Sequence, residues 1–166
     1  MAIPLDPISA ALKGENPKVM VRMPTGFAVI GDRQFLPGYS LLLVDDLSVD
    51  HLTDLPWARR TAFLFDLSLL GEAVFNVARE SGACRINYQI LGNAWPHLHG
   101  HVYPRYSWEP PELAVGPPGG YPKETRDATD TAYSNEKHGP LRDAITVELR
   151  RLMADAFGPD YFAKPS

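Results

Sequence analysis

The chain has 166 residues, about the size of one domain, so a single core that needs no disulfide or structural metal is expected. Hydrophobic residues at 45% and charged residues at 22% are near the globular average, which argues against a disordered or fibrous protein. The net charge is −4 and no apolar run approaches the roughly 18 residues of a membrane span, so nucleic acid polymers and membranes are not expected as partners. A single cysteine and no secretion signal at the N-terminus favour a reducing, cytoplasmic location.

The first half of the chain predicts an arm followed by strands and one long helix. Residues 1–25 contain several prolines and no sustained period, so they are predicted to form an N-terminal arm with one turn of helix over 9–13. The apolar runs 27–30 and 41–44, separated by turn residues, predict a β-hairpin. Asp54 begins a pattern of apolar residues three to four apart that ends at Gly82, which predicts a long helix.

The second half predicts another hairpin, a long loop and a last helix. Alternating residues around 86–90 and 97–103 predict two more strands, so the class is α+β with an antiparallel sheet. The Pro/Gly-rich segment 107–139 is predicted to be a loop that lies against an active site of the same chain or of a partner. A helix is predicted over 140–157, with Pro140 at its start. The expected divisions are therefore arm 1–25, core 26–106, loop 107–139 and helix 140–157.

Three histidines alternate with other residues near the end of the predicted core. On a strand, His97, His99 and His101 project from the same face, with neighbouring side chains about 6.5 to 7 Å apart. Two chemistries suit this arrangement: a metal site, or a nucleophilic histidine with two helpers. The spacing alone does not choose between them.

The segment 96–105, Pro-His-Leu-His-Gly-His-Val-Tyr-Pro-Arg, resembles the signature of the histidine triad superfamily. The order of elements over 26–106 supports the resemblance, with Pro37-Gly38 in the first hairpin and Leu91-Gly92-Asn93 shortly before the histidines. The resemblance implies an antiparallel sheet crossed by one long helix. It also implies a homodimer and a nucleotide hydrolase or transferase that acts at an α-phosphate, as diadenosine polyphosphate hydrolases do.

The resemblance implies that His99 attacks phosphorus and carries the nucleotidyl group until water removes it, while His97 and His101 orient the site and donate hydrogen bonds. No cofactor is implied, and magnesium, where present, would accompany the phosphates of the small nucleotide substrate. Two alternatives stay open: a metal-dependent hydrolase with the three histidines as ligands, and a nucleotide-binding module without turnover.

The resemblance also implies substrate-binding positions outside the triad. Amides suit phosphates because they donate hydrogen bonds without adding charge, and an acidic residue suits ribose hydroxyls. Turn chemistry and core packing are the alternative roles for these residues. The candidates are Asn87 and Asn93 for the phosphates, Gly92 as the substrate-binding glycine before Asn93, Asp32 for the ribose, and Phe27 and Leu41 for the base.

Two residues depart from the pattern of the family. Gly100 replaces an apolar residue between the second and third histidines, which predicts a bulge or a close approach of the backbone to another element. Tyr39 follows Pro37-Gly38 where several members have a further histidine, so the proton network is expected to differ.

Overall fold

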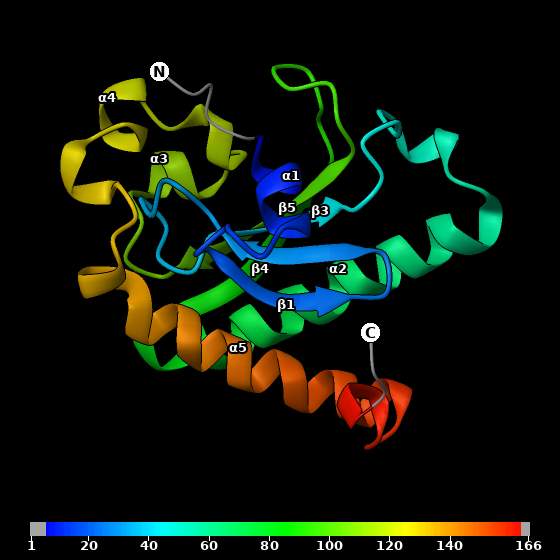
Figure 1. The fold of residues 1–166 in the computed structure, drawn as a ribbon. Helices are drawn as coiled ribbons and strands as arrows, with labels where there is room; N and C mark the ends of the chain where they lie inside the picture. Colours follow the sequence, from blue (N-terminus) through cyan, green and yellow to red (C-terminus); the bar gives the residue numbers. More distant parts are fainter. Residues whose placement is uncertain (1–5, 164–166) are drawn as a thin grey trace.

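Five strands form one antiparallel sheet in the computed structural model, which describes residues 6–163 (Figure 1). Their order across the sheet is β1-β2-β3-β5-β4, so β1 and β4 are the edges. The predicted α+β class is confirmed, as are the hairpin of β2 with β3 and the hairpin of β4 with β5. The strands are β1 (Val19–Met23), β2 (Gly26–Ile30), β3 (Ser40–Val44), β4 (Ala83–Gln89) and β5 (His99–Tyr106).

The long predicted helix is α2 (Trp57–Ala78), which a short 3₁₀ turn over 79–81 extends. It ends at Gly82, whose φ of 92° lies in the left-handed region that glycine adopts without steric cost. Pro56 precedes its first turn, where the missing N–H costs no hydrogen bond. The predicted helix and its glycine end are therefore confirmed, but the helix begins at Trp57 rather than at Asp54, which lies in a separate 3₁₀ turn over 52–54.

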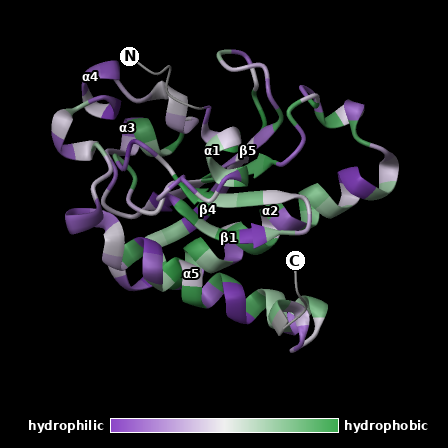
Figure 2. Cartoon of the chain, in the orientation of Figure 1, coloured by the Kyte–Doolittle hydropathy of each residue, from purple (hydrophilic) through white to green (hydrophobic). Residues whose placement is uncertain are grey.

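Helices α2 and α5 (Asn135–Phe157) cover one face of the sheet, and the helix α1 (Pro7–Leu12) lies on the other side (Figure 1). Apolar residues of α5 alternate with hydrophilic ones along its length, as expected for a helix that packs on one side only (Figure 2). The core between the sheet and the two long helices includes Ala28, Leu42, Val102, Phe63, Leu67, Leu70, Val74, Ile145, Leu149 and Met153.

The opposite face of the sheet carries the histidines. Because side chains alternate along a strand, His99 and His101 share a face with Leu41 and Leu43, which are their partners on β3. Helix α1 covers part of this face through Ile8, which packs on β2 and β3. The site is therefore built between α1, the sheet and the loops.

The N-terminal arm is more regular than predicted. Its first five residues lie outside the described range, Asp6 caps α1 by accepting hydrogen bonds from the N–H groups of Ile8 and Ser9 at 3.0 Å, and residues 19–23 form the edge strand β1. The run Val19 to Met23 is short and has no turn signal of its own, but it buries apolar side chains when it pairs with β2. The arm prediction is therefore wrong for β1.

The last helix begins five residues earlier than predicted. Ser134 caps α5 by accepting a hydrogen bond from the N–H of Lys137 at 3.3 Å, and Pro140 lies inside the helix. A proline is tolerated here because only one hydrogen bond, to Glu136, is lost near the N-terminal end. The predicted loop 107–139 holds only short helical pieces before α5, namely α3 (Pro111–Ala114), α4 (Lys123–Arg126) and 3₁₀ turns over 118–120 and 129–131.

Helix α2 departs from the expectation that no segment approaches the apolar length of a membrane span. By length and composition alone, Trp57–Ser81 is long and apolar enough to cross a membrane. Half of the most apolar window of this stretch is buried within the fold, where Phe63, Leu67 and Leu70 pack against the sheet. Packing in the core accounts for this composition.

Gly100 marks a close approach between β5 and α2. A Cβ at this position would lie 2.7 and 2.8 Å from the δ-carbons of Leu67, while the pairing of Gly100 with Leu42 is regular. Of the two predicted explanations, a bulge is therefore wrong and a close approach is confirmed. The glycine lets the strand that carries the histidines lie directly on the core helix.

Candidate active site

The structure brings the three predicted histidines together. His97 lies just before β5, and His99 and His101 lie within it. The ring centroids of His99 and His101 are 4.7 Å apart. His97 and His99 are buried, with only 3% and 7% of their surface exposed.

The ring of His99 is held in one tautomer. Its Nδ1 lies 2.6 Å from the carbonyl oxygen of His97, and a carbonyl can only accept, so Nδ1 carries the proton and donates it. Burial lowers the pKa of His99 below 6.5, which keeps the ring neutral at pH 7. The unprotonated Nε2 of His99 then carries a free electron pair.

His97 is anchored to the end of β3. Its Nε2 lies 3.1 Å from the carbonyl oxygen of Val44, so Nε2 is the donor of this hydrogen bond. One nitrogen of each of the three histidines is thus hydrogen-bonded to a different protein oxygen. Within residues 6–163, no group of three or more His, Cys, Asp or Glu side chains is arranged to hold a metal ion.

His101 lies in an aromatic stack with Tyr39 and Tyr103. The Tyr39 and Tyr103 rings are nearly parallel at a centroid distance of 4.2 Å, and His101 is 5.7 Å from Tyr103. Burial, together with the nearby His99, lowers the pKa of His101 from 6.5 to about 4. His101 is therefore also neutral at pH 7.

A cavity of about 260 Å³ opens beside the histidines, and we call it the Trp95 cavity. It brings the predicted residues Asp32 and Leu41 together, and Asp32 forms an ion pair with Lys18 at its edge. Phe27 is not among the lining residues, because it packs under α1 in the core. The lining residues are Pro7, Asn16, Lys18, Val29, Ile30, Asp32, Arg33, Tyr39, Leu41, Leu43 and Trp95.

A second cavity of about 320 Å³, the Gly92 cavity, touches His97 and His99 directly. The predicted residue Gly92 lines it, together with His51 and Thr53 from the loop after β3. Asn93 lies in the exposed turn next to Gly92 and is not among the residues that line this cavity. The structure therefore brings Gly92, but not Asn93, to the buried histidines.

Two amides of β4 lie on the same face as the triad. Asn87 pairs with Tyr103, and Gln89 pairs with His101. The amide oxygen of Asn87 accepts a hydrogen bond from Nη1 of Arg105 at 2.8 Å. Gln89 is absent from the predicted set, although its alternation with Asn87 on one strand would have indicated it.

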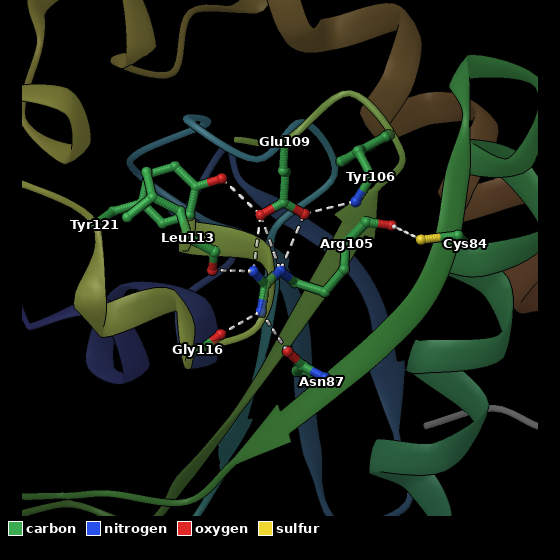
Figure 3. A network of polar contacts seen from close by, with 8 residues as sticks. All are labelled: Cys84, Asn87, Arg105, Tyr106, Glu109, Leu113, Gly116 and Tyr121. Carbon is green, nitrogen blue, oxygen red and sulfur yellow. Dashed lines mark hydrogen bonds and ion pairs between the residues drawn. The ribbon is translucent and has the colours of Figure 1, made fainter. Parts of the chain in front are cut away.

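Arg105 organises a buried polar network beyond the triad (Figure 3). Its guanidinium donates to both carboxylate oxygens of Glu109, to the amide oxygen of Asn87 and to the carbonyl oxygens of Leu113 and Gly116. Only 5% of the Arg105 side chain and none of the Glu109 side chain is exposed. The network fixes the first part of the long loop against β4 and β5.

The end of the long loop is joined to the turn that carries Asp32. The N–H of Gln34 donates to the carbonyl oxygen of Thr131 at 2.6 Å, and the N–H of Tyr133 donates to the carbonyl oxygen of Asp32 at 2.9 Å. The long loop therefore contacts the neighbourhood of two predicted site residues, Asn87 through Arg105 and Asp32 directly. Its predicted contact with the site of a partner stays a prediction.

Trp95 is the most prominent residue that the sequence analysis missed. Its ring centroid is 5.2 Å from those of both His97 and His99. The signal was present, because Trp95, His97 and His99 are spaced by two residues. The alternating pattern of the three histidines therefore extends back to Trp95.

Comparison with known proteins finds no matching family model and no match among curated proteins. Solved structures do match. A histidine triad protein from Sinorhizobium meliloti 1021 is 18% identical with a TM-score of 0.66, over 87% of this chain and 96% of that chain. A histidine triad protein from Marinobacter aquaeolei VT8 is 21% identical with a TM-score of 0.64, over 81% and 89%. A hypothetical histidine triad nucleotide-binding protein from Sulfolobus tokodaii strain7 is 13% identical with a TM-score of 0.66, over 93% and 96%.

Proposed function

We propose that this chain, which has the histidine triad fold, is a nucleotide hydrolase or transferase that acts at an α-phosphate. Its substrates would contain a phosphoanhydride or a phosphoramidate bond, as in diadenosine polyphosphates or nucleoside phosphoramidates. The similar protein from Sulfolobus tokodaii is described as nucleotide-binding, which supports a nucleotide ligand.

The observation that carries the proposal is the hydrogen bond from Nδ1 of His99 to the carbonyl oxygen of His97. It leaves Nε2 of a neutral, buried imidazole unprotonated at pH 7, which is the state a nucleophilic histidine needs. A surface histidine without this bond would interconvert between tautomers.

The proposed reaction has two displacements at phosphorus. Nε2 of His99 forms a bond to the α-phosphorus as the bond to the leaving group breaks, and the leaving group departs with that electron pair and, where it is an amine, with a proton from Nε2 of His101. Water then attacks phosphorus, the P–N bond breaks, and its electron pair returns to Nε2 of His99. The proton of the water restores His101, or passes to solvent where the leaving group took none. The products are a nucleoside monophosphate and regenerated His99.

The remaining candidates take roles around this centre. The base would occupy the Trp95 cavity with Leu41, and the ribose hydroxyls would bond to Asp32. The amides of Asn87 and Gln89 would donate to phosphate oxygens from β4. No cofactor is proposed, and magnesium would arrive with the phosphates of the substrate.

The metal-dependent hydrolase is the main rival. It requires free ring nitrogens that converge on one point, and among residues 6–163 no group of three or more His, Cys, Asp or Glu side chains is arranged to hold a metal ion. The binding module without turnover requires no free nucleophile, so His99 would have no need of a defined tautomer.

The test compares His99→Ala with the intact protein on an α-labelled dinucleoside polyphosphate. We expect kcat to fall at least about a thousandfold while nucleotide binding persists, since only the covalent route is lost. His138→Gln, at the start of α5, is the control and should retain activity. Acid-labile label on the denatured intact protein, absent from His99→Ala, would support the intermediate. Activity that a chelator abolishes and zinc restores would establish the rival instead, and nucleotide binding without turnover would establish the binding module.

We also propose a homodimer that forms through the edge strand β4. Three apolar residues on or near this edge are well exposed, with 47% of Tyr88, 37% of Ile90 and 45% of Leu64 accessible. They line an apolar groove between α2 and β4. An open strand edge beside an apolar groove is a surface that a second copy could cover.

A further inference from the structure

Trp95 joins the Trp95 cavity to the histidines. Its indole is partly buried, contacts the rings of His97 and His99, and lines the same cavity as Asp32. The proposed reaction assigns it no role. A large aromatic side chain at this position would touch both a bound nucleoside and the nucleophile.

The chemistry of the cavity suits a flat aromatic ring. The lining holds two aromatic side chains, Trp95 and Tyr39, and Tyr39 is already stacked on Tyr103 at a centroid distance of 4.2 Å. The other apolar walls are aliphatic and include Val29, Ile30, Leu41 and Leu43. Base stacking on an aromatic side chain strengthens nucleotide binding beyond simple burial, whereas aliphatic walls contribute only burial. The carboxylate of Asp32, in the same cavity, accepts hydrogen bonds and so suits hydroxyls next to that ring.

We propose that Trp95 is the residue on which the nucleobase stacks, and that it thereby determines which base the site prefers. The inference rests on the proposed function, because it names how the nucleoside of that reaction is held. A purine presents a larger ring surface than a pyrimidine, so the site binds purine nucleotides more tightly. Since Trp95 also contacts His99, stacking holds the nucleophile beside the α-phosphate.

A purely structural role for Trp95 would have different effects on stability and on nucleotide affinity. The indole also packs against the cluster of apolar residues under α1. In a structural role, shortening this side chain would lower stability but leave the relative affinities for purine and pyrimidine nucleotides unchanged. Affinity ratios therefore separate the two roles.

The first experiment follows the fluorescence of Trp95 alone. Of the three tryptophans, Trp57 and Trp108 are 84% and 53% exposed and line neither cavity, so Trp57→Phe and Trp108→Phe together leave one reporter. We expect AMP to change the Trp95 emission in a saturable way and ribose 5-phosphate, which has no base, to leave it unchanged. AMP binding measured by calorimetry without any change in emission would overturn the inference.

The second experiment measures affinities of two variants. Trp95→Leu should weaken AMP binding roughly tenfold or more and reduce the preference for AMP over UMP, while Trp95→Phe should retain most of both. Unchanged AMP affinity in Trp95→Leu would overturn the inference and leave the proposed function intact. An intact protein that binds AMP at Trp95 but turns over no substrate would overturn the proposed function alone. Failure of the intact protein to bind any nucleotide would overturn both.

Discussion

The hydroxyl of Tyr39 lies 2.7 Å from Nδ1 of His101, and the two rings are stacked with an interplanar angle of 10°. Burial, and then the nearby Tyr103, raises the pKa of Tyr39 far above 10, so the hydroxyl keeps its proton at neutral pH. A protonated hydroxyl can donate to Nδ1, which places the proton of neutral His101 on Nε2. Tyr39 thus replaces the expected further histidine with a group that does not titrate near neutral pH.

Removal of this hydroxyl should affect the chemical step more than binding. In Tyr39→Phe the stack is preserved, but Nδ1 of His101 loses its donor and the tautomer is no longer defined. We expect kcat to fall about tenfold to a hundredfold, as for other losses of positioned proton donors, with KM nearly unchanged. Steady-state kinetics with a dinucleoside polyphosphate test this, and a rise in KM at constant kcat would contradict it.

The pH dependence of the rate should reflect the lowered histidine pKa values. Burial lowers the pKa of His99 below 6.5, and protonation of Nε2 removes the electron pair that attacks phosphorus. As the pH falls, His99 therefore stays neutral at values where an ordinary histidine is half protonated. We expect kcat/KM to stay near its neutral value at pH 6.5 and to decline only below it. An acid limb centred at or above pH 6.5 would contradict this.

The ion pair of Arg105 with Glu109 should contribute strongly to stability. Glu109→Gln leaves a buried guanidinium without its counter-charge, and breaking such a pair costs about 3 to 5 kcal/mol. The control is Asp155→Asn, which removes a pair that is well exposed and should cost less than about 1 kcal/mol. Urea unfolding of both variants gives the loss of unfolding free energy, and equal losses would contradict the prediction that the buried pair contributes more to stability.

A side chain at position 100 should conflict with α2. Gly100→Ala would place its Cβ within 2.8 Å of Leu67, and overpacking of this kind costs about 1 to 3 kcal/mol. Adding Leu67→Ala should make the effect of Gly100→Ala smaller, since the contact is gone. Gly119→Ala is the control, because nothing lies within 4 Å of a Cβ there. Additive effects of the two changes in thermal unfolding would contradict the proposed contact.

The β4 edge should form the dimer interface. Light scattering at about micromolar protein should give twice the 18.4 kDa mass of one chain. Ile90→Asp places a charge beside the apolar groove and should give the monomer mass, while Val147→Asp, at an exposed position of α5, should not. A monomer mass for the intact chain would contradict the proposed dimer.

The hairpins and the long helix could be predicted because their signals are local. Short apolar runs mark β2 and β3, alternation marks β4 and β5, and Gly82 marks the end of α2. The positions of Asn87 and Phe27 could not be predicted in the same way. Arg105, on the neighbouring strand, holds the amide of Asn87 through a network with the loop that follows β5, and Phe27 is covered by a helix from the arm. Both outcomes depend on long-range packing that local periodicity does not encode.

The bridge between Arg33 and Ala132 joins the turn of Asp32 to a segment a hundred residues away. Two N–H groups, those of Gln34 and Tyr133, donate across this junction in opposite directions. Separation of the two segments breaks both bonds at once, so their amide protons should exchange with deuterium as one cooperative unit. A nucleoside held at Asp32 would slow the exchange of both, which would link ligand occupancy to the C-terminal half of the molecule.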